Sequence, residues 1–363
     1  MPPARQIKTK TEQETLSEAI KREAVRIGFL SAGVADAAAL HKRQPDLTRW
    51  LASGFAGGLQ YMENFFERQR HLLDRFPDLK SILVLTIPYA NKARPSLSQN
   101  AGQVARYAWG RNYHRVIEKR LKQLEAFIQT RAAGAGRIVR CIDTSPIQER
   151  ALAEMAGLGF IGKNTCLILP KGGSFVFLAA LLTNLELPAD KPTAWDCGSC
   201  TLCLESCPTK ALTPSRPYEL DASRCISYLT IENKEAIQPA LRPLMDNWLF
   251  GCDICQEVCP YNRKAQQDPW PEFEAKTGAG AQLPLKEILG IRTDEDFLKR
   301  FAGTPLMRAK RAGLLRNAAV AAGNSGNREL IPTLTETSQQ DPSATVREHA
   351  AWALEQLNPL LPL

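Results

Sequence analysis

Ten cysteines occur in the 363-residue chain, and eight of them lie between Cys197 and Cys259. The other two, Cys141 and Cys166, stand apart. Clustered cysteines usually form a disulfide framework in an exported protein or bind metal in a reducing compartment. No secretory signal is visible at the start of the chain, because residues 5–23 are polar and no apolar segment follows them. The clustered cysteines are therefore predicted to be thiolate ligands of a metal centre.

The first cysteine run has the spacing Cys-x2-Cys-x2-Cys-x3-Cys-Pro, from Cys197 to Pro208. This is the spacing of bacterial two-cluster ferredoxins, in which the fourth cysteine binds the other cluster. The physical reason is that three closely spaced cysteines can wrap one 4Fe–4S cluster, while the fourth, displaced and followed by proline, points away from it. The spacing therefore predicts two 4Fe–4S clusters rather than one.

The second run, Cys252-x2-Cys255-x3-Cys259-Pro, ends in the same way but is one cysteine short of a full set. Cys225 can supply the missing ligand. Exchanging the terminal cysteines between the runs gives two complete sets, which are Cys197, Cys200, Cys203 and Cys259 for one cluster and Cys207, Cys225, Cys252 and Cys255 for the other. Zinc is the alternative metal, but zinc sites use separated Cys-x2-Cys pairs rather than a run of four that ends in Cys-Pro.

Before the cysteine region, strand-like and helix-like segments alternate along the chain. Apolar residues at helical spacing predict amphipathic helices, and short apolar runs predict buried strands. The predicted helices cover 12–29, 115–131 and 147–155, and the predicted strands cover 81–88, 137–142 and 175–182. This alternation favours an α/β domain. We place that domain at residues 1–190, because a Pro-rich polar stretch begins near its end.

A ferredoxin-like domain is predicted for residues 191–270, and the chain beyond it is predicted to be helical. The expected helices cover 307–322, 328–338 and 344–357. Asp341, followed by Pro342, is the expected N-cap of the last helix. Alanine-rich helix pairs are typical of HEAT-like repeats, so residues 271–363 are expected to form an α-helical, HEAT-like segment.

The net charge of +8 and the isoelectric point of about 9.0 suit a polyanionic partner such as RNA or DNA, although a merely basic surface has the same composition. No apolar run approaches the roughly 18 residues that a membrane span requires. We therefore expect a soluble, cytoplasmic protein that does not bind a membrane.

Two other features have both a functional and a structural interpretation. Residues 157–164 read GLGFIGKN and match a glycine-rich nucleotide motif, but a helix is predicted before them where the motif needs a strand. A tight turn after that helix, with Gly157 or Gly159 left-handed, is favoured. Asp143 follows a predicted strand, where functional groups often lie in α/β sheets, although it could simply cap the helix that starts near Pro146.

Several stretches together resemble the epoxyqueuosine reductase family, the cobalamin-dependent iron–sulfur enzymes of tRNA queuosine synthesis. They are DTSPIQERALAEMAGLGFIGKN (143–164), CGSCTLCLESCPT (197–209), RCISYLTIE (224–232) and GCDICQEVCPYN (251–262), with weaker similarity at 80–89 and 105–114. Ordinary ferredoxins have no segment like CISYLTIE, which makes it the most discriminating of these stretches. The chain is more distantly similar to reductive dehalogenases.

The resemblance implies roles for particular residues. Asp143 takes the place of the family's proton donor, and the eight clustered cysteines take the place of its cluster ligands. The implied cobalamin contacts are Arg106, Tyr107, Lys163, Asn164 and Ser227. None of the four histidines lies in the Asp-x-His-x-x-Gly motif that supplies a lower cobalt ligand. A histidine of that motif is therefore not expected to bind the cobalt.

The resemblance also implies an activity, which is the reduction of epoxyqueuosine to queuosine at the wobble position of tRNA. Cobalamin is expected to be reduced through the two clusters by an external electron donor, in a protein that is a monomer. Asp143 would protonate the opening epoxide, which requires a raised pKa. Arg308, Lys310, Arg311 and Arg316 are expected to bind tRNA phosphates. The alternatives are a reductive dehalogenase-like enzyme that acts on a small molecule and a non-enzymatic, ferredoxin-like electron carrier.

Overall fold

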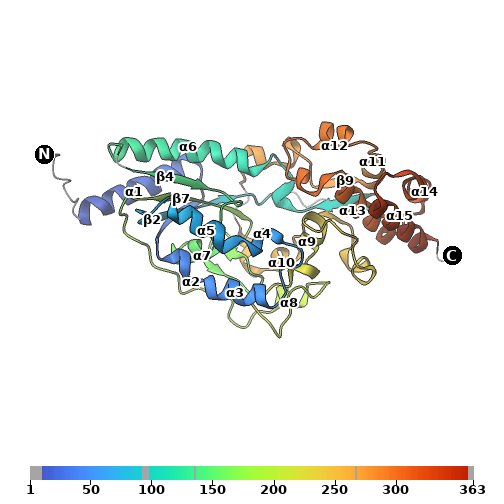
Figure 1. The fold of residues 1–363 in the computed structure, drawn as a ribbon, viewed down its shortest axis with the longest axis horizontal. Helices are drawn as coiled ribbons and strands as arrows, with labels where there is room; N and C mark the ends of the chain where they lie inside the picture. Colours follow the sequence, from blue (N-terminus) through green and yellow to red (C-terminus); the bar gives the residue numbers. More distant parts are fainter. Residues whose placement is uncertain (1–9, 92–97, 135, 266–267, 359–363) are drawn as a thin grey trace.

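The computed structural model describes residues 10–91, 98–134, 136–265 and 268–358. The molecule is elongated, and the N-terminus and C-terminus lie at opposite ends of its long axis (Figure 1). A sheet-containing part forms one end, and a group of helices forms the other. The segments that carry the clustered cysteines lie between these two parts and along one side of the molecule (Figure 1).

The main sheet has four strands in the order β1-β2-β7-β4, which are Ser31–Asp36, Ser81–Pro88, Val176–Thr183 and Ile138–Cys141. Every residue of β2 is buried, as the apolar run at 81–88 predicted. Leu83, Leu85 and Ile87 pack into the core on one face of the sheet, and Ile82 and Val84 pack into the core on the other. This double burial explains why the strand shows no alternation of polar and apolar residues.

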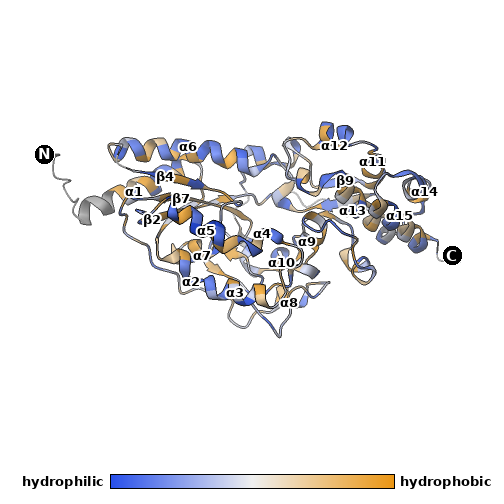
Figure 2. Ribbon diagram, in the orientation of Figure 1, coloured by the Kyte–Doolittle hydropathy of each residue, from blue (hydrophilic) through white to orange (hydrophobic). Residues whose placement is uncertain are grey.

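Helices cover both faces of this sheet. On one face lie α1 (Lys10–Ile27) and α6 (Tyr113–Arg131), whose buried residues Ile20, Ile117 and Leu121 join the same core as Leu85. On the other lie α2 (Ala39–Lys42) and α7 (Glu149–Met155). Polar residues dominate the surface of α6, with apolar residues recurring along it (Figure 2). The predicted helices and strands of this region are therefore present, with ends shifted by a few residues.

The strand directions differ from those of a typical α/β sheet. All three neighbouring pairs, β1 with β2, β2 with β7 and β7 with β4, are antiparallel. Parallel strands need a crossover connection between neighbours, whereas here the long chain between β2 and β7 carries β4 to the sheet edge. The region contains both helices and strands, but its sheet is antiparallel.

A second, three-stranded sheet joins distant parts of the chain. Its order is β8-β3-β9, which are Trp248–Phe250, Ala101–Val104 and Gln282–Pro284. Each of the three regions expected from the sequence contributes one strand. The C-terminal helices α11 (Leu285–Leu289) and α13 (Lys310–Ser325) pack against this sheet in one continuous core.

The cysteine region contains short elements. They are the helices α8 (Leu202–Glu205), α9 (Ile226–Ile231) and α10 (Ile254–Glu257), and the hairpin of β5 (Phe160–Ile161) and β6 (Leu167–Ile168) lies beside them. The other helices are α3 (Gln44–Ala52), α4 (Gln60–Glu63), α5 (Phe65–Asp74), α12 (Asp294–Phe301), α14 (Ile331–Gln340) and α15 (Ala344–Leu357). Within the described ranges, no helix is long and apolar enough to cross a membrane.

Helix α15 spans the predicted residues, but its cap was predicted wrongly. The N-cap is Ser343, whose side chain accepts a hydrogen bond from the N–H of Val346. Asp341 is instead buried and forms an ion pair with Arg311 of α13. A buried guanidinium needs a charged partner, and that requirement outweighs the capping preference of Asp341.

We expect Leu85→Ala to lower the free energy of unfolding by about 2–5 kcal/mol, because it leaves a cavity between β2 and the helices that cover it. Leu85 has no exposed surface. Urea denaturation measures this change. Leu298→Ala is the control, since Leu298 is 47% exposed, and its effect should stay within about 0.5 kcal/mol. Equal effects of the two substitutions would contradict the described core.

Candidate functional site

The clustered cysteines form two groups, and each group combines residues from distant parts of the chain. In the first group, Cys259 lies beside Cys197 in a small apolar cluster with Phe160 and Ile168. Burial and the nearby Cys197 and Cys259 raise the pKa of Cys203 to about 11. Cys200 also lies close enough to raise the pKa of Cys203 and of Cys259.

The second group contains Cys207, Cys225, Cys252 and Cys255. Burial is the main reason that the pKa values of Cys225 and Cys252 are raised, and Cys207 adds to both. The pKa of Cys255 is raised first by a hydrogen bond with Cys166, then by burial. Cys166 is therefore a fifth thiol at the edge of this group.

Both groups fit the predicted ligand exchange. Cys259, from the second run, lies with the first three cysteines, and Cys207, from the first run, lies with Cys225 and Cys252. Crowded thiolates repel one another in a buried site, and bound iron would compensate for that repulsion. Among the described residues, no group of His, Cys, Asp and Glu side chains is arranged to hold a single metal ion, so the case for clusters rests on spacing and grouping.

The turn between β5 and β6 contacts both cysteine groups. The Nζ of Lys163 donates to the carbonyl oxygens of Gly198, at 2.8 Å, and Cys200, at 2.9 Å. The next residue, Asn164, donates from Nδ2 to the carbonyl oxygen of Cys255 at 3.3 Å. Two of the predicted cobalamin contacts therefore hold the cysteine loops in place.

The glycine-rich motif that contains these two residues forms a tight turn, as predicted. Gly157 directly follows the end of α7 and has a φ of +71°. A Cβ at Gly157 would lie 2.4 Å from the carbonyl oxygen of Lys191. The glycine is therefore required both by its backbone conformation and by the close approach of another segment.

Arg106 holds the second cysteine group against the sheet-containing part. It is buried, and its Nη1 lies 3.0 Å from Asp253 and 2.6 Å from Glu257. Burial raises the pKa of Asp253 to about 6, and Arg106 opposes that increase. Because its guanidinium is already paired with two carboxylates, Arg106 supports the loop that carries Cys252 and Cys255.

The other two predicted cobalamin contacts lie on either side of this loop. The Ser227 hydroxyl and its backbone N–H form hydrogen bonds with Cys225, which lower the pKa of the thiol. Tyr107 packs on Phe250 and Tyr113. Its pKa is raised mainly by burial, then by the charges of Asp143 and Asp253. Tyr107 therefore lies between the second cysteine group and Asp143.

Asp143 follows β4 on a strained turn. Its φ is +53°, a left-handed conformation that costs energy for any residue with a side chain. Its carboxylate Oδ2 accepts a hydrogen bond from the Tyr113 hydroxyl at 2.8 Å and lies 3.2 Å from Nε2 of His114. Desolvation raises the pKa of Asp143, but the hydrogen bonds from His114 and Tyr113 outweigh it, and the pKa is below its usual value. The expected raised pKa is therefore wrong for this state of the protein.

Glu149 is a second carboxyl group beside this turn. Burial and the charge of Asp143 raise its pKa to about 8, although the backbone N–H of Asp143 donates a hydrogen bond to it. Its Oε1, the Oε1 of Gln148 and the Nε2 of His114 are buried atoms without a hydrogen-bond partner in the described part of the chain. Three unpaired polar atoms beside Asp143 are available to a bound polar molecule.

Residues from the C-terminal region also reach Asp143. Arg308 forms a two-pronged ion pair with Glu232, at 2.8 and 2.9 Å, and its charge lowers the pKa of Asp143. Tyr61 is 44% exposed and lies near Asp143, Glu232 and Arg308. Sequence patterns did not single out Tyr61, Glu149 or Glu232, because they approach Asp143 only through the tertiary fold.

Two family descriptions match parts of the chain. Residues 196–262 match the 4Fe-4S double cluster binding domain. Residues 70–144 match the family described as epoxyqueuosine reductase QueG, DUF1730. Together they cover both cysteine groups and the segment from α5 to Asp143.

Several relatives resemble nearly the whole chain. An epoxyqueuosine reductase of Cellulophaga algicola is 40% identical over 310 residues, which cover 84% of this chain and 97% of the relative. One of Pseudomonas aeruginosa is 38% identical over 344 residues, which cover 93% of this chain and 94% of the relative.

Solved structures agree with these relatives. A crystal structure of epoxyqueuosine reductase with an epoxyqueuosine-modified tRNA-Tyr stem loop has a TM-score of 0.84 at 32% identity, covering 95% of this chain and 91% of that one. The Bacillus subtilis enzyme, solved with its catalytic aspartate loop swung out of the active site, has a TM-score of 0.82 at 31% identity and the same coverage.

We expect Glu149→Gln to flatten the pH dependence of stability. Since the pKa of Glu149 is raised from 4.5 to about 8 by folding, the stability that its protonated form contributes is fully present below the lower value and is lost as the pH rises through the higher one. Glutamine stays neutral, so the variant should lose less stability across this window, and one pKa unit is worth about 1.4 kcal/mol. Thermal unfolding at roughly pH 5 and pH 9 measures the difference. Identical pH profiles would refute it.

Proposed function

The chain belongs to the epoxyqueuosine reductase family, and we propose that Asp143 is its proton donor and that the two cysteine groups are its cluster ligands. The protein is an oxidoreductase that reduces epoxyqueuosine to queuosine in tRNA. The observation that carries the proposal is the meeting of Asp143, the second cysteine group and the C-terminal residue Arg308 around one buried tyrosine, Tyr107.

The cofactors are two 4Fe–4S clusters and cobalamin, which supply the electrons of the reduction when they are bound. Eight thiols in two groups of four match the ligand demand of two cubane clusters. The polar atoms without partners beside Asp143, on His114, Gln148 and Glu149, fit a large ligand with many amide groups. Residues placed to hold cobalamin are Tyr107 and Ser227, whereas Arg106, Lys163 and Asn164 hold the cysteine loops.

Opening an epoxide develops negative charge on oxygen, and a positioned acid stabilises that charge. Tyr113 and His114 orient the carboxylate of Asp143. Its lowered pKa means that a bound substrate must change its surroundings before it can hold a proton. Excluding water, or displacing the contact with His114, would raise the pKa and so load the acid.

The tRNA base is within reach of such a site because unpaired loop bases can be extruded without opening a duplex. Arg308 and Lys310 are exposed and remain candidates for phosphate contacts. Arg311 and Arg316 are buried, and the expectation that they bind phosphates is wrong. They were assigned to the surface because their helix was read as a solvated one, whereas α13 is buried on most of its circumference.

Other features of the proposal are finer than the family alone supports. We propose an external electron donor, a monomeric protein that works in the cytoplasm, and a division into residues 1–190, 191–270 and 271–363. The antiparallel contacts of α13, α14 and α15 support a HEAT-like tail. The two alternative functions, a dehalogenase-like enzyme and an electron carrier, lose their support because close relatives over the whole chain are named epoxyqueuosine reductase.

We expect Asp143→Asn to abolish most turnover, by roughly 10²–10⁴-fold, while iron content, cobalamin uptake and tRNA binding stay unchanged. Asparagine tolerates the left-handed conformation of this position, so the fold should be kept. Conversion of epoxyqueuosine in a tRNA stem loop, followed by mass spectrometry of the nucleosides, measures the effect. Asp294→Asn, on exposed α12, is the control and should be fully active. Full activity of Asp143→Asn would rule out Asp143 as the donor.

We expect the double variant Cys207→Ser/Cys225→Ser to lose about half of the bound iron, because both residues serve the same cluster. Cys203→Ser/Cys259→Ser should likewise lose half. If the ligands were instead assigned in sequence order, each pair would damage both clusters and remove nearly all iron. Iron and sulfide analysis of anaerobically reconstituted protein distinguishes the two assignments.

A further inference from the structure

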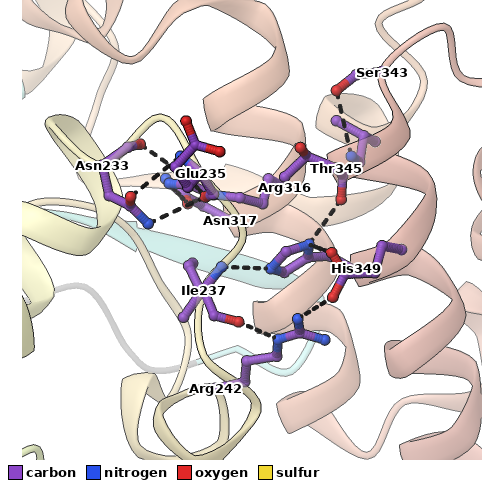
Figure 3. A network of polar contacts seen from close by, with 11 residues as sticks. Asn233, Glu235, Ile237, Arg242, Arg316, Asn317, Ser343, Thr345 and His349 are labelled. Carbon is purple, nitrogen blue, oxygen red and sulfur yellow. Dashed lines mark hydrogen bonds and ion pairs between the residues drawn. The ribbon is translucent and has the colours of Figure 1, made fainter.

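Two buried polar residues of α13 point away from solvent and toward the cysteine region. Arg316 is 1% exposed and Asn317 is fully buried. The guanidinium of Arg316 has no carboxylate partner among the described residues. It donates instead to the carbonyl oxygens of Asn233 at 2.9 Å, Glu235 at 2.7 Å and Leu229 (Figure 3). A buried charge solvated only by backbone carbonyls is costly, so the position invites a functional explanation.

Asn317 connects the two segments that lead to cysteines of the second group. Its Nδ2 donates to the carbonyl oxygen of Thr230, at 2.8 Å, and to that of Leu249, also at 2.8 Å. Its Oδ1 accepts from Arg316 at 2.9 Å. Thr230 belongs to α9, which begins directly after Cys225, and Leu249 belongs to β8, which leads to Cys252. One amide therefore fixes α9 relative to β8.

Thr230 continues this network to the cysteine itself. Its hydroxyl accepts a hydrogen bond from the N–H of Gly251 at 2.9 Å, and it donates to the carbonyl oxygen of Ile226 at 2.7 Å. Gly251 directly precedes Cys252, and Ile226 directly follows Cys225. The spacing of the two cysteines thus depends on hydrogen bonds that start on α13.

The loop after α9 is held by the same group of helices. The N–H of Ile237 donates to Nε2 of His349 at 3.1 Å, and the other ring nitrogen of His349 lies 2.7 Å from the carbonyl oxygen of Thr345 (Figure 3). Burial lowers the pKa of His349 to about 4, which keeps the ring neutral and able to accept. These contacts place α13 and α15 firmly against the segment 229–242.

We propose that Arg316 and Asn317 are positioning residues for the cluster held by Cys207, Cys225, Cys252 and Cys255, so that the C-terminal helices set its reduction potential. The inference rests on the proposed function, because it presumes that this group binds a cluster. Cluster potentials depend on hydrogen bonding, burial and the fixed positions of the ligands. Cysteines of the first group receive no such hydrogen bonds from α13 in the described structure.

The test is Asn317→Leu, which keeps the approximate size of the side chain but removes both donors. The expected result is two clusters by iron content, with a shifted midpoint potential and altered EPR signal for one cluster and unchanged values for the other. In a Cys203→Ser/Cys259→Ser background, the remaining cluster should show the shift. In a Cys207→Ser/Cys225→Ser background, the remaining cluster should not.

The matched control is Arg311→Met/Asp341→Asn, which removes a buried ion pair of the same helix. Those residues make no contact with α9 or β8 among the printed hydrogen bonds of the pair, so the control should lower stability without moving either potential. Thr230→Val breaks the network nearer the cysteines and should shift the same cluster if Asn317→Leu does not fold.

Two failures can be told apart. Wild-type protein that binds no iron would overturn the proposed function and the inference with it. Wild-type protein with two clusters, whose potentials stay the same in Asn317→Leu and in Thr230→Val, would overturn the inference alone. Equal shifts in the control and in Asn317→Leu would show a general effect of instability, and this result would also overturn it.

Discussion

The structure depends on the mutual repulsion of crowded thiols and on what the surrounding backbone does to contain it. Cys259 lies beside Cys197, and Cys207 lies beside Cys225, so neither cysteine run can form its site alone. The supports come from outside both runs: Lys163 holds the first loop, and Arg106 pairs with Asp253 next to Cys252. A scaffold with fixed hydrogen bonds is what a pair of cubane clusters requires of a protein.

The sequence could predict features that depend on local pattern. The run at 81–88 is a strand, the last helix covers 344–357, and Gly157 forms a left-handed turn. The pairing of cysteines was also predictable, because ferredoxin spacing carries its own geometry. These features share one property, which is that residues close in sequence determine them.

Features that depend on partners distant in sequence could not be predicted. Arg311 and Arg316 looked like surface cations, but one meets Asp341 and the other meets the carbonyls after α9. Asp143 was expected to have a raised pKa, yet Tyr113 and His114 lower it, and these residues meet Asp143 only when α6 packs on the sheet. The raised pKa belongs instead to Glu149, whose side chain no motif had marked.

The three-stranded sheet has a consequence for the birth of the protein on the ribosome. Strand β3 pairs with β8 and β9, so its partners are made only after residue 248 and residue 282 have been translated. Pairings between such distant segments form late, since chain closure must precede them. The nascent cysteine segment therefore emerges while this sheet is still open, a period during which assembly factors can reach its thiols before the C-terminal helices close over them.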